Sequence, residues 1–339
     1  MNQLNFRSFS SRLASAGLCA LLFLSSGAQA ANPLDELAHN ARFSMDFSTR
    51  VIDSMGKTWT QQAIGIDYHK VFSAERGDVG VLTLQPFVVR IDDAPMVPGI
   101  FDDNHDQALQ WRIANFNYTG LAQGRFNIRV GHMEVPFGLE HVIGTTNGTL
   151  HQFNAPKVAG LKADWGVSIN GVLPWFEYEI AKTQGSGNEF NDSAEGLVAG
   201  RIGLPRDGLW WLGVSGLEGA VERGPNEVDQ QRWALDAGIR LPRGFNLLME
   251  YAQGEDGVAD VQHQLFELNW HTPTENTFVY TQWRASESEV VGATARSRNL
   301  HVGFRYMPDN HFIASMELRH HLDAENHDVT GLMQLRYRL

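Results

Sequence analysis

The feature that most constrains this chain is a regular alternation of apolar and polar side chains along many short segments. Between residues 41 and 52, for example, Phe43, Met45 and Phe47 alternate with serine and aspartate. A period of two residues places successive side chains on opposite faces of an extended strand. The sequence therefore predicts an all-β protein whose strands have one apolar face and one polar face.

When the alternating segments are taken in order, they predict about sixteen strands. The expected strands are 41–52, 58–72, 78–91, 107–119, 124–136, 163–171, 174–183, 194–204, 209–217, 230–241, 244–253, 262–271, 276–285, 296–307, 310–321 and 329–339. Short connections rich in Pro, Gly, Asp and Asn alternate with longer ones. The longer connections are expected at 92–106, 137–162, 184–193, 218–229, 254–261, 286–295 and 322–328. This alternation of short turns and long loops is typical of a transmembrane antiparallel β-barrel.

The first thirty residues are predicted to be an export signal. Arg7 and Arg12 precede an apolar run from Leu13 to Leu24, and Ala28-Gln29-Ala30 has the small residues that signal peptidase prefers. We therefore expect cleavage near Ala30, which leaves residues 31–339 as a single domain. Beyond residue 30, no apolar stretch approaches the roughly 18 to 20 residues of a membrane-spanning helix. An exported chain of this kind is expected to be either dissolved outside the cytoplasm or a barrel in the bacterial outer membrane.

The charge of the chain argues against nucleic acid as a partner. The sequence has 27 Lys and Arg against 39 Asp and Glu, a net charge of −12, and its basic residues form no cluster. A nucleic-acid-binding protein needs a basic surface to neutralise phosphates. Five of the acidic residues lie in the expected loop 92–106. We interpret that loop as a solvated surface, with bridging to lipopolysaccharide through divalent cations as the alternative.

Catalytic and cofactor motifs are not found in the sequence. It has no Gly-x-Ser-x-Gly elbow and no glycine-rich phosphate loop, and its one cysteine, Cys19, lies in the export signal. We therefore expect no enzymatic activity, no cofactor and no disulfide, and an outer-membrane enzyme is only the third hypothesis. Residue types that bind metals crowd one segment: His320, His321, Asp323, Glu325 and His327. Histidines beside an acidic loop are more often unliganded, so no metal is expected there.

A family resemblance is carried by residues 130–140, which read VGHMEVPFGLE. This segment resembles the G-x-x-x-x-P-F-G-L-E stretch of the porin O/P family of outer-membrane proteins, whose best-known members are phosphate-selective. Further support comes from residues 110–114, 164–167 and 199–201, so the resemblance covers about residues 107–205. It implies a trimeric porin of sixteen strands. It also implies that the long third loop, 137–162, which follows the loops 53–57 and 92–106 on the same side, folds into the lumen and narrows it.

Two features depart from the family. Phosphate selectivity in the family is associated with a group of lysines in addition to arginines, but beyond residue 30 this chain has only Lys57, Lys70, Lys157, Lys162 and Lys182. Phosphate is therefore not expected to be the specific solute. The chain also ends in Leu339, where the usual assembly signal of such barrels ends in Phe. Leucine keeps the apolar alternation of the last strand, so insertion into the membrane is still expected.

The alternation also predicts which charged residues face the interior. The arginines expected in the lumen are Arg42, Arg50, Arg125, Arg129, Arg201, Arg232, Arg240, Arg305, Arg319, Arg336 and Arg338. The carboxylates expected beside them are Asp46, Glu177, Glu179, Asp236, Glu250, Glu267 and Glu317. The resemblance adds the constriction-loop residues Glu140, His141, His151, Lys157 and Lys162. These charges would either attract anions or form ion pairs that stiffen the wall.

The sequence thus predicts an outer-membrane porin for the passive diffusion of small hydrophilic solutes, with a mild preference for anions. The expected partners are these solutes, outer-membrane lipid and lipopolysaccharide, and two further copies of the chain in a homotrimer. The alternative is a narrow barrel that serves as a structural sheath or partner for another exported protein, such as an electron-transfer cytochrome.

Overall fold

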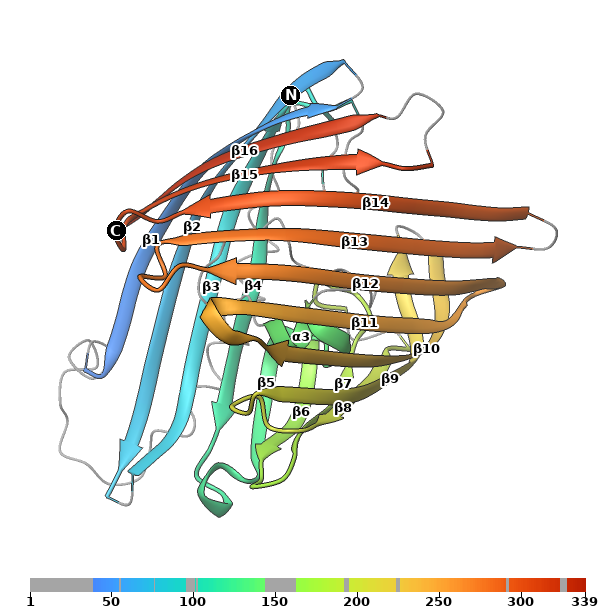
Figure 1. The fold of residues 1–339 in the computed structure, drawn as a ribbon. Helices are drawn as coiled ribbons and strands as arrows, with labels where there is room; N and C mark the ends of the chain where they lie inside the picture. Colours follow the sequence, from blue (N-terminus) through green and yellow to red (C-terminus); the bar gives the residue numbers. More distant parts are fainter. Residues whose placement is uncertain are drawn as a thin grey trace, which may run out of the picture. The chain divides into compact units, whose positions relative to one another are not determined.

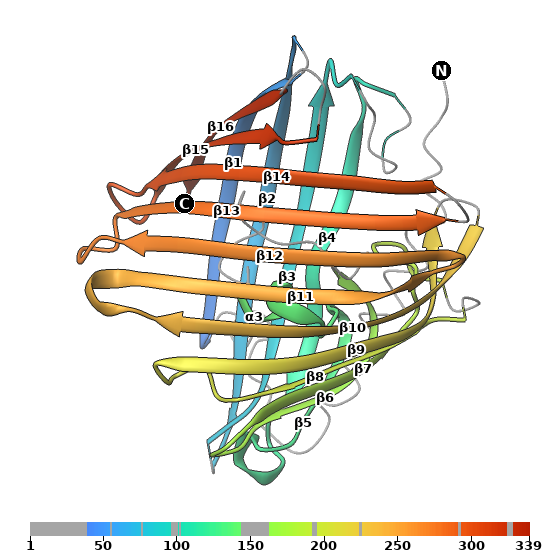
Figure 2. The same cartoon turned by 45° about the vertical axis from the view of Figure 1, so that its right-hand side comes forward.

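The alternating segments form the strands of a closed antiparallel barrel. The computed structural model describes residues 39–54, 56–75, 77–95, 101, 103–143, 163–191, 195–223, 226–290, 293–323 and 328–339. Within these residues, each strand pairs with its neighbours in sequence, and the first strand pairs with the last (Figures 1 and 2). The expected fold class, an all-β barrel of sixteen strands, is therefore confirmed.

The strand bounds agree closely with the sequence pattern. The strands are β1 (Ala41–Ser54), β2 (Lys57–Ala74), β3 (Gly77–Asp92), β4 (Gln107–Tyr118), β5 (Asn127–Glu134), β6 (Ala163–Val172), β7 (Glu177–Thr183), β8 (Leu197–Gly203), β9 (Trp210–Arg223), β10 (Asn226–Arg240), β11 (Phe245–Asp256), β12 (Ala259–His271), β13 (Thr277–Val290), β14 (Ala293–Tyr306), β15 (Phe312–His321) and β16 (Val329–Arg338). One short helix, α3 (Gly138–Ile143), follows β5. No helix in the described ranges is long and apolar enough to cross a membrane.

Pairing of β1 with β16 closes the barrel. In this pair, Asp46 lies opposite Arg338 and Thr49 lies opposite Leu335. A closed sheet has no edge strand, so the backbone N–H and C=O groups of every strand can be satisfied within the sheet.

The two faces of the strands differ as the alternation predicts. Outward side chains such as Phe43, Ile180 and Leu318 are largely exposed, whereas interior Glu317 and Gln282 are almost fully buried. Neighbouring strands keep this parity because the register places interior residues opposite interior residues, as with Glu317 and Leu332. An apolar outer wall and a polar inner wall are the arrangement that a barrel in lipid requires.

Three of the expected long loops are wrong. Segments 218–229, 254–261 and 286–295 are mostly strand, and the strands on either side pair to within one or two residues of each turn. Arg223 lies opposite Asn226, Asp256 opposite Ala259, and Val290 opposite Ala293. The sequence pattern missed these extensions because their side chains are mostly polar on both faces.

The beginning of the third loop turns into the barrel. Helix α3 contacts β9, β10 and β11, and Figures 1 and 2 both show it within the ring of strands. The inward fold expected for loop 137–162 is therefore seen for residues 137–143, whereas residues 144–162 lie outside the described residues.

Close approach between strands requires glycine at one interior position of β14. The ring of Tyr280 lies so close to the Cα of Gly303, opposite it in the sheet, that a Cβ atom at position 303 would overlap the ring. Glycine thus leaves the space through which Tyr280 reaches across to β15. Gly216 on β9 differs, because a Cβ atom there would meet only the Arg232 carbonyl oxygen at 3.8 Å.

We expect Gly303→Ala to destabilise the barrel by about 1–3 kcal/mol, because overpacking forces the Tyr280 ring out of its position. The matched control, Gly216→Ala, should leave the unfolding midpoint in urea within the error of the measurement. The two variants can be compared by the urea dependence of tryptophan fluorescence in detergent. Equal midpoints for both variants would contradict the packing role assigned to Gly303.

Candidate functional site

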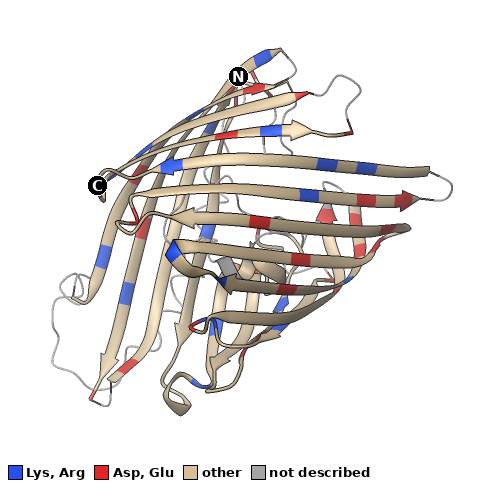
Figure 3. Cartoon of the chain, in the orientation of Figure 1, with Lys and Arg blue, Asp and Glu red and all other residues tan. Residues whose placement is uncertain are grey.

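The interior wall bears the charged groups of the barrel, and these divide into two sectors. Figure 3 shows charged residues distributed along the strands of both. The first sector comprises the interior faces of β12 to β16, β1 and β2. Its charged residues are Arg42, Arg50, Arg284, Arg305, Arg319, Arg336 and Arg338, against Asp46, Asp67, Glu267 and Glu317. Arginines outnumber carboxylates, so this sector is basic.

Glu317 is the centre of the first network. Its carboxylate accepts hydrogen bonds from Tyr280 Oη and from Arg319 Nε, and His301 Nδ1 lies 3.3 Å from its Oε1. These partners come from β13, β14 and β15, so one carboxylate ties three strands together. A buried carboxylate is tolerated in such a site because charge-assisted hydrogen bonds replace its hydration.

A second network closes the seam of the barrel. Arg336 Nη2 donates to Asp46 at 2.5 Å, and Arg338 Nη2 donates to Asp67 at 2.5 Å. Asp67 also accepts a hydrogen bond from Gln85 at 2.9 Å. These contacts join β16 to β1, β2 and β3, so the charged groups at the seam act mainly on each other.

Arg305 differs from these arginines. Its guanidinium carbon lies 4.7 Å from the centre of the Phe278 ring, which is a cation–π geometry. Among the described residues, no carboxylate lies within ion-pairing distance of Arg305. Its positive charge is therefore less neutralised than that of Arg319 or Arg336.

The second sector, on β5 to β11, is acidic. Arg201 donates to both oxygens of Asp236, at 2.7 and 3.0 Å, and to Glu177 at 3.1 Å. Arg129 donates to Glu179 at 2.8 Å, and Arg232 donates to Asp256 at 2.5 Å. Asp164 and Glu250 are also buried here. Carboxylates outnumber arginines, so the two sectors have opposite charge.

The third loop is attached to the acidic sector by its first residues. Val135 and Phe137 pack in an interior apolar cluster with Leu197, Leu217 and Ala252. Burial of these side chains holds the loop against β8, β9 and β11, because separation would return their apolar surface to water.

Hydrogen bonds fix the start of α3 on the same wall. The Gly138 N–H donates to Ser215 Oγ at 2.9 Å, and the Leu139 N–H donates to a carboxylate oxygen of Glu250. Gly138 adopts a φ of 60°, and a Cβ atom there would overlap Glu250. The motif PFGLE thus provides the proline that ends the strand, the apolar anchors and the glycine that lets the backbone approach the wall.

His141 of α3 lies in the charged part of the interior. Its Nε2 is 3.4 Å from Glu179 Oε2. Burial lowers the pKa of His141 below its ordinary value of 6.5, an effect that the nearby Glu179 and Glu134 oppose. The imidazole is therefore uncharged at neutral pH and lies beside a carboxylate that Arg129 already neutralises.

The structure places most of the expected site residues on the interior wall. Arg42, Arg50, Arg129, Arg201, Arg305 and Arg319 have interior parity, and the side chain of His141 points to Glu179. The prediction that Arg125 faces the lumen is wrong, because Arg125 is exposed in the turn before β5, just after the 3₁₀ helix at Ala122–Gly124. Helix α3 includes Glu140, but its side chain lies outside the described residues, as do His151, Lys157 and Lys162.

Some interior groups were missed by the sequence pattern. Arg284, His301 and Tyr280 have interior parity, but they lie on strands whose apolar and polar residues are mixed on the inner face. His301 could have been found by counting in twos from Arg305 along β14, because both residues lie on the same face of that strand. Arg112 and Glu134 form a further buried ion pair at 3.2 Å, on β4 and β5.

The histidine-rich segment contains separate pairs rather than a shared centre. His321 Nε2 lies 3.2 Å from Thr330 Oγ1, and Asp323 binds Arg298. The described residues contain no group of three side chains suited to hold a metal ion, and Glu325 and His327 lie outside them.

Comparisons with known proteins show the fold. No model of a protein family matches the sequence, and neither does a curated protein. Among solved structures, the chain is similar to OmpF of Salmonella typhi in complex with daunomycin, with a TM-score of 0.63, 11% identity, and coverage of 88% of this chain and 97% of that one.

Two further structures have the same fold. The anion-selective porin of Comamonas acidovorans has a TM-score of 0.57 at 9% identity, with coverage of 88% of this chain and 99% of that one. OmpT, an outer membrane protein of Vibrio cholerae, has a TM-score of 0.57 at 10% identity with the same coverage. The chain therefore has the porin-like barrel fold.

We expect Glu250→Ala to loosen the attachment of the third loop, because the N–H of Leu139 would lose a charge-assisted hydrogen bond. The variant should be cleaved several-fold faster by trypsin after Lys157 or Lys162 in the folded barrel. Glu250→Gln keeps an acceptor oxygen and serves as the matched control. Cleavage that is equally slow in both variants would show that the apolar anchors alone hold the loop.

His141 should contribute a pH-dependent term to stability. Because its folded pKa lies below 6.5, the unfolded chain binds more protons in this range, so stability falls as the pH decreases from 6.5 through the lowered value. His141→Gln should remove this component from the pH dependence of the unfolding free energy at pH values below 6.5. An unchanged pH profile would contradict the burial of a neutral imidazole.

Proposed function

We propose that the chain is an outer-membrane porin that lets small hydrophilic solutes cross by passive diffusion. The observation that carries this proposal is the closed barrel with an apolar outer wall and a charged, polar inner wall. Inside such a barrel, polar side chains replace part of the hydration of a passing solute. The similarity in fold to solved porins supports the same function.

The proposal includes export and location. Residues 1–30 are an export signal cleaved near Ala30, and residues 31–339 are the barrel domain in the bacterial outer membrane. Loop 137–162 is the constriction, and its attachment through Phe137 and α3 to β8–β11 supports this role. The short PFGLE motif at Pro136–Glu140 supports the finer placement with the porin O/P family.

A mild anion preference is the favoured selectivity. Most interior carboxylates are neutralised by arginines, but Arg305 stacks on Phe278 and offers its charge to the lumen. One structural neighbour, the Comamonas protein, is described as anion-selective. The pairs around Glu317 and Asp236 serve to stiffen the wall, so both roles considered for the interior charges operate together.

A homotrimer in contact with outer-membrane lipid and lipopolysaccharide is the proposed assembly. The Vibrio cholerae neighbour, OmpT, was solved in a trimer form. The many exposed apolar side chains on the outer wall of the described strands can face either lipid or another copy of the chain.

Planar-bilayer recording of the purified protein tests the proposal. We expect discrete conductance steps and, in a salt gradient, a reversal potential that indicates a preference for anions over cations. Arg305→Gln should lower the anion-to-cation permeability ratio by up to about tenfold, because one unit charge about 6 Å from the ion path in water favours anions and disfavours cations by about threefold each. Lys157→Glu and Lys162→Glu should shift the ratio in the same direction if loop 137–162 forms the constriction.

The outcomes separate the alternatives. A silent bilayer containing correctly inserted barrel would contradict the diffusion channel and favour a sheath for another exported protein. Steps whose ion preference is unchanged by Arg305→Gln would contradict the role of Arg305. Arg296→Gln, on the outer face of β14, is the control, and it should leave the permeability ratio unchanged.

A further inference from the structure

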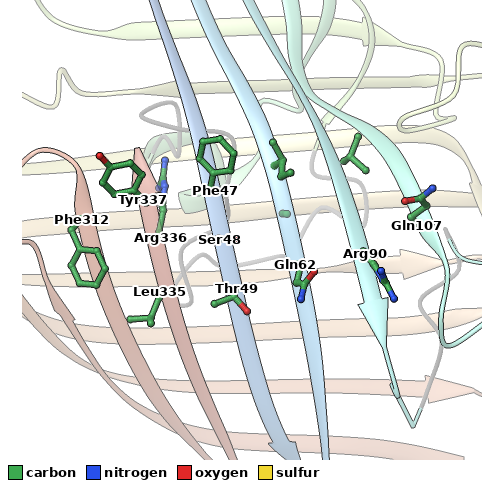
Figure 4. A pocket seen from close by; sticks show the side chains of 13 residues that line it. Phe47, Ser48, Thr49, Gln62, Arg90, Gln107, Phe312, Leu335, Arg336 and Tyr337 are labelled. Atoms are coloured by element: carbon green, nitrogen blue, oxygen red, sulfur yellow. The ribbon is translucent and has the colours of Figure 1, made fainter. Parts of the chain in front are cut away.

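A groove lies on the outward wall of the barrel across the seam. Its volume is about 500 Å³. The lining residues belong to β15, β16, β1, β2 and β3, with Gln107 at the start of β4 (Figure 4). The groove thus lies on the face opposite to the interior site and spans the strands that close the barrel.

The groove is apolar over most of its length and polar at one edge. The apolar part is formed by Phe312, Tyr337, Leu335, Phe47, Ile64 and Val88. The polar edge is a single row across four strands, in which Thr49 lies opposite Gln62, Gln62 opposite Arg90, and Arg90 opposite Gln107. Beyond this row, towards the strand ends, the outward residues Thr60 and Asp92 are also polar.

Arg90 is the one cationic side chain of this row, and it is paired with Asp92. Its Nε and Nη2 donate to one oxygen of Asp92 at 3.1 and 3.0 Å, which fixes the direction of the guanidinium. The Arg90 side chain is 57% exposed, whereas that of Asp92 is only 20% exposed. The guanidinium, rather than the carboxylate, is therefore presented to a ligand in the groove.

We propose that this groove binds a single lipid with an anionic, phosphorylated headgroup. Its acyl chain lies along the apolar part, and its phosphate lies at the polar row, where Arg90 supplies a charged donor and Gln62, Gln107 and Thr49 supply neutral ones. The inference rests on the proposed function, because the barrel must span an outer membrane for the polar row to lie at headgroup level.

The position of the polar row favours a lipid over a second copy of the chain. A row of this kind is found elsewhere on the outer wall: β10 changes from Trp233 to Gln231 and β11 from Tyr251 to Gln253 along their outward faces. The row at Arg90 is thus the edge of the apolar band nearest to loop 92–106, rather than a polar patch within the band. Lipid headgroups lie at this edge, and a basic side chain there attracts anionic lipid.

Native mass spectrometry of the delipidated barrel in detergent tests the proposal. The probes are phosphatidylglycerol and phosphatidylcholine with identical acyl chains, and inorganic phosphate alone. We expect one phosphatidylglycerol per protomer, bound at least fivefold more tightly than phosphatidylcholine. Inorganic phosphate should not compete at millimolar concentration, because it lacks the acyl chain. Displacement of the lipid by inorganic phosphate would instead mark a phosphate site and overturn the proposal.

Variants locate the bound lipid. Arg90→Gln should weaken phosphatidylglycerol binding about fivefold and leave phosphatidylcholine unchanged, while Arg90→Lys should retain most of the preference. Arg296→Gln is the matched control, because Arg296 is also on the outward wall, is 54% exposed and is paired with Glu287. Equal losses in Arg90→Gln and Arg296→Gln would show non-specific attraction and overturn the assignment.

Filling the groove gives an independent readout. Val88→Trp should reduce the binding of both lipids, since the ring occupies the space of the acyl chain. A Gln62→Cys variant tests the other occupant, because residues 31–339 contain no other cysteine. Disulfide-linked dimers of this variant in lipid vesicles, with no lipid retained in the groove, would assign the groove to contact between copies and overturn the lipid proposal.

Conductance distinguishes this failure from failure of the proposed function. Arg90→Gln should form the same channel steps in planar bilayers as the unchanged protein, because Arg90 faces away from the lumen. Normal steps with no lipid selectivity would overturn only the groove assignment. Absence of steps in the unchanged protein would contradict the porin itself.

Discussion

Closure of the sheet between β1 and β16 is the constraint on which the structure depends. Once the first strand pairs with the last, the backbone is satisfied without an edge, and every residue faces either inward or outward. The seam needs more than backbone pairing, because it joins segments at opposite ends of the chain. Arg336 and Arg338 of β16 add side-chain contacts across the seam through their ion pairs with Asp46 and Asp67.

In the proposed porin, the interior charges serve structure and selectivity together. Burying an ion pair seldom adds net stability, but loss of one partner leaves an uncompensated charge, so each pair defines which strands lie side by side. Glu317, with partners on three strands, and Arg201, with two carboxylates, are examples. The interior charge that these pairs leave over is what the proposed channel would present to solutes, and in the basic sector it includes Arg305 over Phe278.

Much of the fold could be predicted from the sequence, because alternation is a local signal. The parity of Phe43, Asp46, Glu317 and most of the arginines follows from counting residues within one strand. Strand ends were less predictable. β9 continues to Arg223 and β10 begins at Asn226 although neither face is apolar there, and Arg125 lies in a turn because the backbone bends before β5. Where both faces are polar, no difference between them marks the strand.

The sequence by itself determined which face of the sheet each side chain takes, because a strand alternates with a period of two whatever its neighbours are. Only the tertiary structure decided which interior groups meet. The Leu139 N–H reaches Glu250, 111 residues away, and Tyr280 reaches Glu317 across the space left by Gly303. Such contacts depend on the curvature and register of the closed sheet, which bring distant strands to face one another, and no local pattern records them.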